Sequence, residues 1–326
     1  MPADELGEFE RIQRFFAPLA GPGGLGLLDD AAIVDCRAGQ RLVVTADAIV
    51  AGVHYLPDDP PDLVARKLLR VNLSDLAAMG ASPAWATLAL TLPQADVHWV
   101  AGFADGFAAL AHEQNVALVG GDTTQGPLSI TVTVHGFVRE GAALRRAGAR
   151  AGDVVCVTGT LGDAAAGLKL LLAQQATQSG EQSARAQLIA RLNRPTPRIA
   201  QGSILAGRAH ACIDVSDGLV ADLGHICRAS GVAAEIDADA LPTSAALAAL
   251  FDSNARCAFQ LAGGDDYELC FTVSEADSKE LLAELVRSGC AATRIGRIAE
   301  GAGVRVRDAN GKIIDTPRTG WQHFAA

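Results

Sequence analysis

Short apolar runs that end in carboxylates recur along this chain, and they limit what it can fold into. The run Leu42 to Thr45 has strand composition and leads into Asp47, and Val116 to Val119 leads into Asp122 in the same way. Helix signals lie between such runs. A chain that alternates short strands with amphipathic helices is predicted to form a mixed α/β fold whose strand ends carry charge.

The length of 326 residues exceeds the usual size of one compact domain, so two domains are expected. Small residues between 147 and 152 precede a new strand signal, Val154 to Val157, and this change of pattern marks a boundary. We therefore predict two domains, residues 1–150 and 151–326, with a mixture of helices and strands in each.

The second half of the chain begins with the strand signal at Val154, and its other signals alternate between helix and strand. In the first half, Trp99, Phe103, Phe107 and Leu110 form one apolar stripe on a helix predicted over 96–113, which indicates core packing. Further helices are expected over 163–173, 198–206 and 219–229, strands over 211–215, 259–261 and 269–273, and a polar loop over 174–183.

Charge and composition exclude several classes of function. The formal net charge of −10 argues against a nucleic-acid partner, whose affinity depends on Lys and Arg neutralising phosphates. No run of 18 apolar residues occurs, and the start lacks a basic segment followed by an apolar one, so no membrane partner and a cytoplasmic location are expected. The seven cysteines are scattered without a C-x-x-C pair, which indicates reduced, mostly buried thiols.

The most informative feature is a set of short acidic motifs at predicted strand ends and helix starts. Mg²⁺ prefers carboxylate, hydroxyl and carbonyl oxygens, so several such clusters could build a multi-metal site. Any one of these aspartates could equally be a helix cap or a turn residue. The motifs are Asp29-Asp30, Thr45 to Asp47, Asn72 to Asp75, Gly120 to Thr124 and Asp214 to Gly218.

The common nucleotide signatures are absent, because the chain has neither a G-x-x-x-x-G-K-[ST] loop nor a Gly-rich loop with a V-A-I-K strand. Two weaker features remain open. The stretch Thr158 to Asp163 is either a turn that approaches phosphate or an ordinary strand-to-helix turn. The pair Arg145-Arg146 is either solvated or a phosphate clamp.

Four blocks of sequence resemble the signature blocks of the thiamine-monophosphate kinase family. They are Asn72 to Pro83 (NLSDLAAMGASP), Gly120 to Pro127 (GGDTTQGP), Ile213 to Leu219 (IDVSDGL) and Gly263 to Leu269 (GGDDYEL), and the match runs in order from Gly7 to Phe324. The resemblance implies an α/β (mixed α+β) chain with the two-domain aminoimidazole ribonucleotide synthetase-like fold. It also implies a homodimer in which N-terminal sheets pair.

The resemblance further implies an ATP-dependent and Mg²⁺-dependent phosphorylation of thiamine monophosphate, with these two small molecules as partners. On the residues alone, His54 would be a turn histidine and Trp321 an anchoring aromatic, and no side chain is nominated as a general base or nucleophile. The implied metal ligands are Asp30, Thr45, Ala46 through its carbonyl, Asp47, Asp75, Asp122, Asp214 and Asp217; the implied ATP contacts are Gly121, Asp122, Arg146 and Ser216; the implied substrate contacts are His54, Asp265 and Trp321.

Three positions depart from the family pattern: Leu28 replaces a glycine beside the first metal ligand, Ala46 replaces a hydroxyl residue, and Asp265 replaces a glutamate. Two alternatives are weighed against the kinase. One is another ATP-dependent synthetase of the same superfamily, and the other is a binder of thiamine phosphate without turnover. The full set of acidic residues disfavours the binder, because a passive pocket has little use for so much clustered negative charge.

Overall fold

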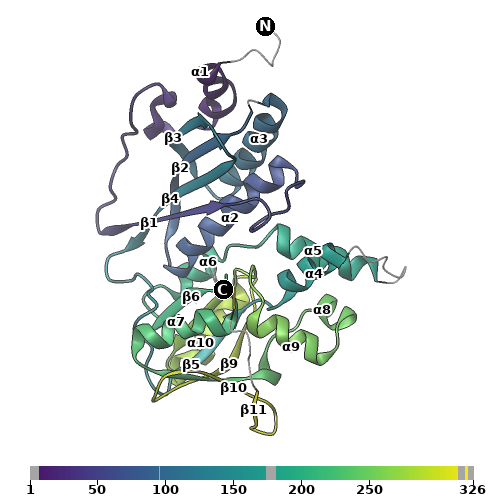
Figure 1. Ribbon diagram of the computed structural model, residues 1–326. Coiled ribbons are helices and arrows are strands. Elements are labelled where there is room, and N and C mark those ends of the chain that lie inside the picture. The colour runs from purple at the N-terminus through teal and green to yellow at the C-terminus, as the bar shows by residue number, and fades with distance from the viewer. Residues whose placement is uncertain (1–6, 95, 174–180, 315–319, 322–326) are drawn as a thin grey trace. The chain divides into compact units, whose positions relative to one another are not determined.

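The structure is a computed structural model that describes residues 7–94, 96–173, 181–314 and 320–321 (Figure 1). The chain divides into two compact units. The first contains Met1–Leu76 and Ala81–Glu140, and the second contains Ala77–Gly80 and Gly141–Ala326. Residues 174–180 of the expected polar loop and residues 322–324 of the C-terminal family block lie outside the described residues.

The first unit is built on a four-stranded sheet in the order β1-β4-β2-β3 among its described residues (Figure 1). Strand β4 pairs antiparallel with β1 and β2, and the parallel pair β2–β3 is connected by helix α3. The elements are α1 (Glu8–Arg11), η2 (Ile12–Phe16), η3 (Ala17–Leu19), η4 (Pro22–Leu27), β1 (Gln40–Ile49), α2 (Pro61–Ala78), β2 (Ser82–Leu92), α3 (Val97–Glu113), β3 (Ala117–Gln125) and β4 (Ser129–Arg139).

The predicted stripe on α3 is confirmed as core. Asp96 caps the helix by accepting from the N–H groups of His98 and Trp99, and Phe103 and Phe107 are fully buried. Helix α3 packs closely on the start of α2, because a side chain at Gly106 would clash with the backbone of Asp62 at 2.4 Å. These two helices lie on one side of the sheet (Figure 1).

The two faces of the edge strand β1 differ sharply. Its odd-numbered residues from Val43 to Ile49 are half-buried or buried, whereas Leu42, Val44, Ala46 and Ala48 are exposed. The period of two is the one that a strand imposes on its side chains. One face of β1 is therefore turned toward the core of the unit, and the other presents an apolar row to the surface.

The second unit contains a seven-stranded sheet in the order β11-β10-β7-β9-β5-β8-β6 among its described residues. The pair β10–β7 is parallel and the other neighbours are antiparallel. The elements are β5 (Val154–Thr158), α4 (Asp163–Ala173), α5 (Gln182–Asn193), α6 (Ile199–Leu205), β6 (Ala211–Asp214), α7 (Leu219–Ser230), β7 (Ala233–Asp237), η5 (Ala238–Ala240), α8 (Ala245–Leu250), α9 (Ser253–Ala262), β8 (Leu269–Val273), α10 (Glu275–Arg287), β9 (Ala292–Ala299), β10 (Gly303–Arg307) and β11 (Ile313–Ile314).

Both faces of this sheet are covered. On β5, Val155 and Val157 pack in a cluster with Leu223 of α7, whereas Val154 and Cys156 pack in a second cluster that includes residues of α6 and α10. A strand buried on both faces reads as a continuous apolar run, which is why Val154 to Val157 does not alternate.

Helices α4, α5, α8 and α9 pack against one another around a small core of Ala166, Leu188 and Leu247. The strand predicted at 259–261 is wrong, because these residues lie in α9. Asp252 caps that helix by accepting from the N–H of Ala255, and the cap outweighs the β-propensity of the short segment FQL.

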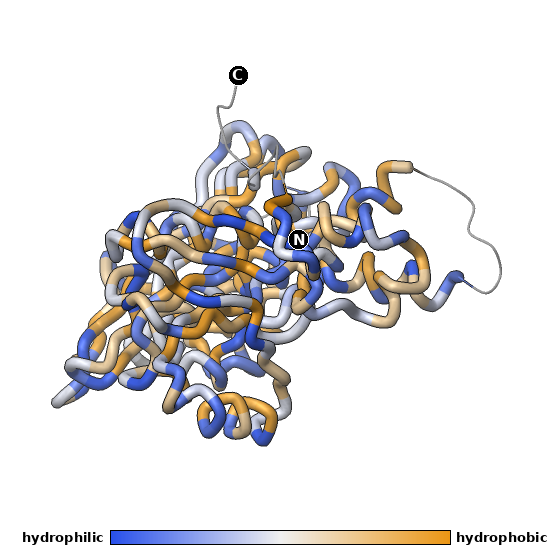
Figure 2. The backbone as a smooth tube through the Cα atoms, turned by 90° about the horizontal axis from the view of Figure 1, so that it is seen from below, coloured by the Kyte–Doolittle hydropathy of each residue, from blue (hydrophilic) through white to orange (hydrophobic). Residues whose placement is uncertain are grey.

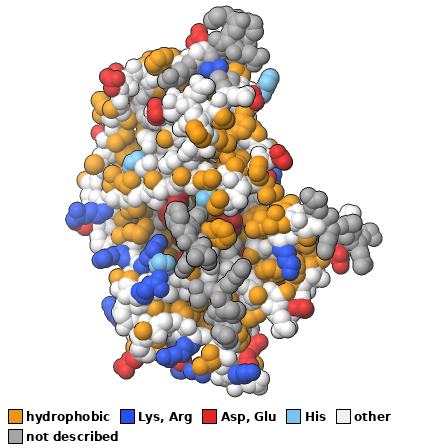
Figure 3. All heavy atoms as spheres, in the orientation of Figure 1, with side chains coloured by type: hydrophobic (Ala, Val, Ile, Leu, Met, Phe, Trp, Pro, Cys, Tyr) orange, Lys and Arg blue, Asp and Glu red, His pale blue; other side chains and the backbone are white. Residues whose placement is uncertain are grey.

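Coloured by hydropathy, the described chain shows short hydrophobic stretches interrupted by hydrophilic residues (Figure 2). No helix among the described residues is both long and apolar enough to span a membrane. On the face drawn in Figure 3, basic and acidic side chains are interspersed with hydrophobic ones. All seven cysteines are free, and five of them are buried, as the scattered spacing predicted.

Candidate active site

Three predicted metal ligands of the first unit meet where β1 crosses α2. Thr45 and Asp47 lie on the half-buried face of β1, and the Thr45 hydroxyl donates to an Asp75 carboxylate oxygen of α2 at 2.5 Å. The backbone N–H of Asp47 donates to Oδ1 of Asn72, one turn before Asp75, at 3.0 Å. Asn72 and Asp75 of the NLSD block therefore link the helix to the strand, and the Asp75 carboxylate lies beside the Thr45 hydroxyl.

The electrostatics of this group fit a cation. Burial, and then the charge of neighbouring Asp75, raises the pKa of Asp47 to about 6. Both aspartates lie inside secondary-structure elements rather than at helix ends, so neither is a helix cap. Two carboxylates and a hydroxyl at one place are the oxygen donors that Mg²⁺ prefers, and a bound cation would relieve their mutual repulsion.

The remaining predicted ligands of this unit lie elsewhere on it. Asp30 is exposed in a bend after η4, and Gly121 and Asp122 are exposed on β3, at the opposite edge of the sheet from β1. Asp47 and Gly121 lie at aligned positions of the sheet, on strands that are separated by three strand spacings. Their backbones are therefore about 14 Å apart. The described residues contain no group of three or more His, Cys, Asp or Glu side chains gathered as metal ligands.

Two departures from the family pattern are accommodated without strain. Leu28 has φ of −108° and ψ of −13°, an ordinary conformation that does not need glycine. Ala46 is exposed on the face of β1 opposite to Thr45 and Asp47, so a hydroxyl there would point away from them. Only its backbone carbonyl remains as a ligand for a metal held by Asp47.

In the second unit, the predicted residues Asp214, Ser216 and Asp217 lie on the turn from β6 into α7. Asp214 ends the strand and is buried, whereas Ser216 and Asp217 are half-buried. One carboxylate oxygen of Asp222, in the first turn of α7, accepts from the N–H groups of Ser216, Asp217 and Gly218 at 3.0 to 3.1 Å. Burial, and then the charge of Asp217, raises the pKa of Asp222 to about 7, and the three N–H groups oppose that rise.

The same turn holds the two predicted substrate residues through its carbonyl oxygens. The N–H of Asp265 donates to Ser216 at 2.8 Å, and the N–H of Trp321 donates to Asp217 at 2.9 Å. A glycine precedes each donor: a side chain at Gly264 would meet the Ser216 oxygen at 2.6 Å, and one at Gly320 would meet the Asp217 oxygen at 2.7 Å. Both glycines therefore permit these close approaches of the backbone.

The segment from Gly263 to Leu269 carries unusual backbone angles. Asp265 has φ of 67° and Tyr267 has φ of 53°, and the Tyr267 hydroxyl donates to the Asp265 carboxylate at 3.3 Å. Positive φ is tolerated by aspartate and is costly for a bulky residue. Such conformations persist where the surroundings fix them, and they cluster at ligand-binding sites.

Two buried carboxylates within this segment hold it in place through hydrogen bonds and ion pairs. Asp266 accepts from the N–H groups of Gly162 and Ala164, at 2.6 and 3.3 Å. Glu268 accepts from the Thr158 hydroxyl at 2.7 Å and from the arginines Arg191 and Arg198 at 2.5 to 2.8 Å. Of the two interpretations of Thr158 to Asp163, the structure favours the ordinary strand-to-helix turn, because the protein's own carboxylate Asp266 accepts from two N–H groups at the start of α4.

Arg146 is exposed and belongs to the second unit. Its carbonyl accepts from the Ser230 hydroxyl at 3.2 Å, at the end of α7. His225 of α7 has its pKa lowered by burial and then by the charges of Arg228 and Arg146, while Asp217 acts in the opposite direction. The charges of Arg146 and Asp217 thus act in opposite directions on the pKa of one imidazole.

His54 lies in a turn after β1. Its Nδ1 accepts from the N–H of Val50 at 3.0 Å, and its own N–H donates to the Val50 carbonyl at 2.9 Å. In the neutral imidazole the proton therefore lies on Nε2.

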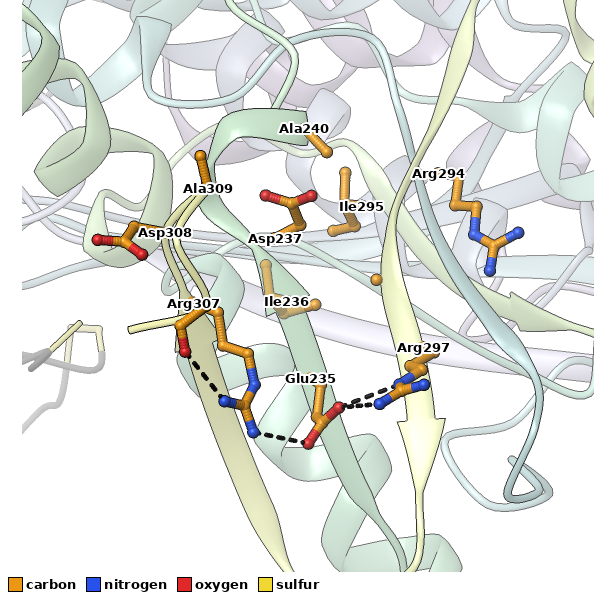
Figure 4. Close-up of a pocket in the computed structure, with 12 residues that line it drawn as sticks. Glu235, Ile236, Asp237, Ala240, Arg294, Ile295, Arg297, Arg307, Asp308 and Ala309 are labelled. Atoms are coloured by element: carbon orange, nitrogen blue, oxygen red, sulfur yellow. Dashed lines mark hydrogen bonds and ion pairs between the residues drawn. The ribbon is translucent and has the colours of Figure 1, made fainter. Parts of the chain in front are cut away.

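A cavity of 490 Å³ lies away from these residues, between β7, β9 and the loop after β10 (Figure 4). Glu235 lies between Arg297 and Arg307 and accepts hydrogen bonds from both, and Arg294 donates to Glu275. None of the predicted site residues lines this cavity. Its arginines are already paired with carboxylates, and the candidate residues of the second unit lie at the Ser216 turn and not at this cavity.

Sequence reasoning missed Asp222 and the two arginines that hold Glu268. An acidic residue in the first turn after the DG of the IDVSDGL block is a helix-start signal that could have indicated Asp222. Arg191 and Arg198 lie 77 and 70 residues from Glu268 in the chain. Their pairing has no local signal in the sequence.

Comparison with known proteins places this chain in a family. Residues 28–138 match the model of the AIR synthase related protein, N-terminal domain, and residues 150–309 match its C-terminal domain. The thiamine-monophosphate kinase of Salmonella typhimurium is 47% identical over 98% of both chains. The crystal structure of the thiamine-monophosphate kinase from Stenotrophomonas maltophilia K279a is 49% identical, covers 88% of this chain and 91% of its own, and superposes with a TM-score of 0.81.

A solved structure of AaThiL complexed with AMPPCP and TMP is 36% identical, covers 99% of both chains and superposes with a TM-score of 0.77. The matches define the class first: this is a mixed α/β protein with the two domains of the AIR synthase related fold. Within that class, the chain belongs to the thiamine-monophosphate kinase family, and it is therefore an enzyme.

Proposed function

We propose that this enzyme transfers the γ-phosphate of ATP to thiamine monophosphate and so forms thiamine diphosphate. One observation carries the proposal: the turn that holds Ser216 and Asp217 is hydrogen-bonded directly to Asp265 and Trp321. Residues expected to contact nucleotide and metal thereby adjoin residues expected to contact the acceptor. The relative complexed with AMPPCP and TMP supports both ligands.

The acceptor explains why no general base is needed. A phosphate monoester has a second pKa of about 6, so its attacking oxygen is already ionised at pH 7. We infer direct in-line transfer, in which the residues bind and orient two anions rather than move a proton. The anions repel each other by roughly 4 kcal/mol per pair of unit charges at about 4 Å and an effective dielectric of 20.

That repulsion calls for cations. Bound Mg²⁺ would neutralise charge on the transferred group and on its leaving oxygen. We infer that Thr45, Asp47 and Asp75 hold metal in the first unit and that Asp214 and Asp217 do so in the second, with Asp30, Asp122 and the Ala46 carbonyl as further ligands. Arg146, with Gly121 and Ser216, is the proposed contact to the phosphates of ATP.

The proposed contacts to the acceptor are His54 of the first unit and Asp265 and Trp321 of the second unit. The thiazolium ring is a fixed cation, which Asp265 would attract and Trp321 would cover by cation–π contact. Asp265 is one methylene shorter than the family's usual glutamate, and the Tyr267 hydroxyl, which donates to it, helps to orient the shorter carboxylate.

We also propose a cytoplasmic homodimer that pairs through the first unit, which ends at Glu140, ten residues before the domain end predicted at residue 150. The apolar row Leu42, Val44, Ala46 and Ala48 on an edge strand supports this face. Sedimentation of the purified protein measures the assembly, and charged substitutions at Leu42 and Val44 are expected to yield monomers.

The activity is tested with purified enzyme, Mg-ATP and thiamine monophosphate. ADP and thiamine diphosphate should appear in equal amounts, and label from γ-labelled ATP should never remain on the denatured protein. A stoichiometric phosphoenzyme on the reaction path would rule out direct transfer. Binding of thiamine monophosphate without any turnover would identify a non-catalytic binder, and ADP formation with a different acceptor would identify another synthetase of the superfamily.

A further inference from the structure

Asp222 has a place in this site that the family resemblance does not assign. Its side chain comes from the fourth residue of α7, and the residue is 3% exposed. A single oxygen, Oδ2, accepts from three successive N–H groups of residues 216–218. Successive N–H groups converging on one anion form a backbone nest, so here the protein supplies its own anion to fix a turn.

The contacts of Asp222 go beyond the capping of a helix. Gly218 is the residue at the N-cap, and Ser216 and Asp217 come before the helix begins. A first-turn carboxylate that only capped α7 would accept from the N–H of the N-cap residue, Gly218, and from no earlier residue. Asp222 instead holds two residues of the preceding turn, and these are the residues expected to contact ATP and metal.

The other side of the same peptide groups faces the acceptor segment. The carbonyl oxygens of Ser216 and Asp217 accept from the N–H groups of Asp265 and Trp321. Peptide planarity links the two sides, because rotating a peptide to free its N–H also turns its carbonyl away. The position of Asp222 is thereby coupled to the position of the acceptor pocket through two backbone hydrogen bonds.

We propose that Asp222 is a positioning residue that fixes the turn of residues 216–218 and, through its carbonyls, aligns the Asp265 and Trp321 segments with the metal side of the site. The inference rests on the proposed kinase function for its catalytic consequence. The fixing of the turn does not depend on that function. Asp222 is assigned no contact with a substrate, because its Oδ2 atom accepts from the N–H groups of residues 216–218.

Two variants and a matched control test the proposal. Asp222→Asn keeps one acceptor oxygen and removes the charge, and Asp222→Ala removes the acceptor entirely. Asp153→Asn is the control, because Asp153 is 4% exposed, accepts from the N–H of Arg150 at 2.9 Å and precedes β5. Strands β5 and β6 each pair antiparallel with β8, so they run parallel to each other. Asp153 precedes β5 and the Ser216 turn follows β6, so the two lie at opposite ends of the strands of one sheet.

The first measurement is amide hydrogen exchange in the enzyme without nucleotide or metal. Asp222→Asn should raise exchange of the peptide covering 216–218 at least about tenfold, since an unheld turn opens locally, while Asp153→Asn leaves that peptide unchanged. The second is steady-state kinetics per folded molecule. Asp222→Asn should lower kcat/KM for thiamine monophosphate about 100-fold, because misplacement by 1 Å can cost that much, and Asp222→Ala should lower it further.

Three outcomes decide the matter. Wild-type exchange at 216–218 in Asp222→Asn would overturn the proposal, because the turn would then be held without the carboxylate. Faster exchange with wild-type kinetics per folded molecule would also overturn it, since the turn would not align the substrates. A wild-type enzyme that forms no thiamine diphosphate would reject the proposed function and the kinetic part of this inference, and the exchange data would still decide whether Asp222 fixes the turn.

Discussion

The backbone N–H of Trp321 donates a 2.9 Å hydrogen bond to the carbonyl oxygen of Asp217. This bond joins two residues more than 100 positions apart and sets the exposed indole beside the turn that carries a predicted metal ligand. The side chain of Trp321 is 57% exposed, so packing alone does not explain an aromatic residue here. The proposed cation–π contact with the thiazolium ring would cover its face.

Replacing Trp321 by alanine should therefore affect the acceptor and spare the fold. The KM for thiamine monophosphate should rise roughly tenfold, because a cation–π contact is worth about 0.5 to 2 kcal/mol. The KM for ATP and the melting temperature should stay near wild type. Trp321→Phe retains an aromatic face and serves as the control; equal loss in both variants, or an equal rise in the KM for ATP, would contradict the role.

Asp265→Asn separates charge from backbone conformation. Asparagine tolerates positive φ at least as well as aspartate, so the turn at φ of 67° should be kept. We expect the KM for thiamine monophosphate to rise about tenfold and that for ATP to stay unchanged. Asp252→Asn, at the cap of α9, removes a carboxylate elsewhere and should change neither constant. A comparable loss for ATP would move Asp265 out of the acceptor pocket.

Local patterns predicted much of this fold and part of the site. The helix over 163–173 and the strand over 269–273 have the predicted bounds, because burial and propensity agree there. The strand prediction at 259–261 was wrong, because a cap seven residues upstream begins a helix that includes these residues. The link between Ser216 and Asp265, and the arginines that hold Glu268, depend on contacts distant in sequence, and periodicity carries no information about them.

Asp47→Asn tests whether the acidic cluster of the first unit serves a ligand or the scaffold. Without magnesium, neutralising Asp47 removes the repulsion with Asp75 that helps raise its pKa, so stability should stay constant or increase by about 1 kcal/mol at pH 7.5. With Mg-ATP, the wild type gains stability by mass action, and the variant should lose most of that gain together with turnover.

Asp96→Asn is the matched control for that experiment, because Asp96 caps α3 in the same unit and asparagine caps equally well. Thermal melts of the three proteins with and without Mg-ATP, together with an ADP assay, provide the measurement. An Asp47→Asn protein that melts lower without ligand and still turns over normally would show that Asp47 belongs to the scaffold.

Glu268→Gln should be strongly destabilising, because it leaves Arg191 and Arg198 without their buried carboxylate. Breaking a buried ion pair from one side typically costs about 3 to 5 kcal/mol. Glu235 also accepts from two arginines, but their side chains are 66% and 40% exposed, so Glu235→Gln should cost about 1 kcal/mol or less. Urea unfolding of both variants measures the difference, and equal costs would show that the Glu268 network is not a buried one in solution.

Asp266 should make the stability of the enzyme depend on pH. Burial raises the pKa of its carboxyl well above the usual value, against the opposing effect of the Gly162 N–H. The folded protein therefore keeps a proton that the unfolded chain loses near pH 4, so the contribution of this group to the free energy of unfolding falls as pH rises above about 4, until the folded pKa is reached.

Asp266→Asn removes that proton uptake and retains an acceptor for Gly162. Near pH 4 the free energy of unfolding of the variant should equal that of the wild type. Between pH 4 and the folded pKa of Asp266, the variant should become more stable than the wild type by up to about 1.4 kcal/mol per pH unit. Urea unfolding between pH 4 and 8 measures this, with Asp252→Asn as an exposed control that keeps the wild-type slope. If the variant instead becomes less stable than the wild type as pH rises, then Arg191 and the two N–H groups keep the folded carboxylate ionised.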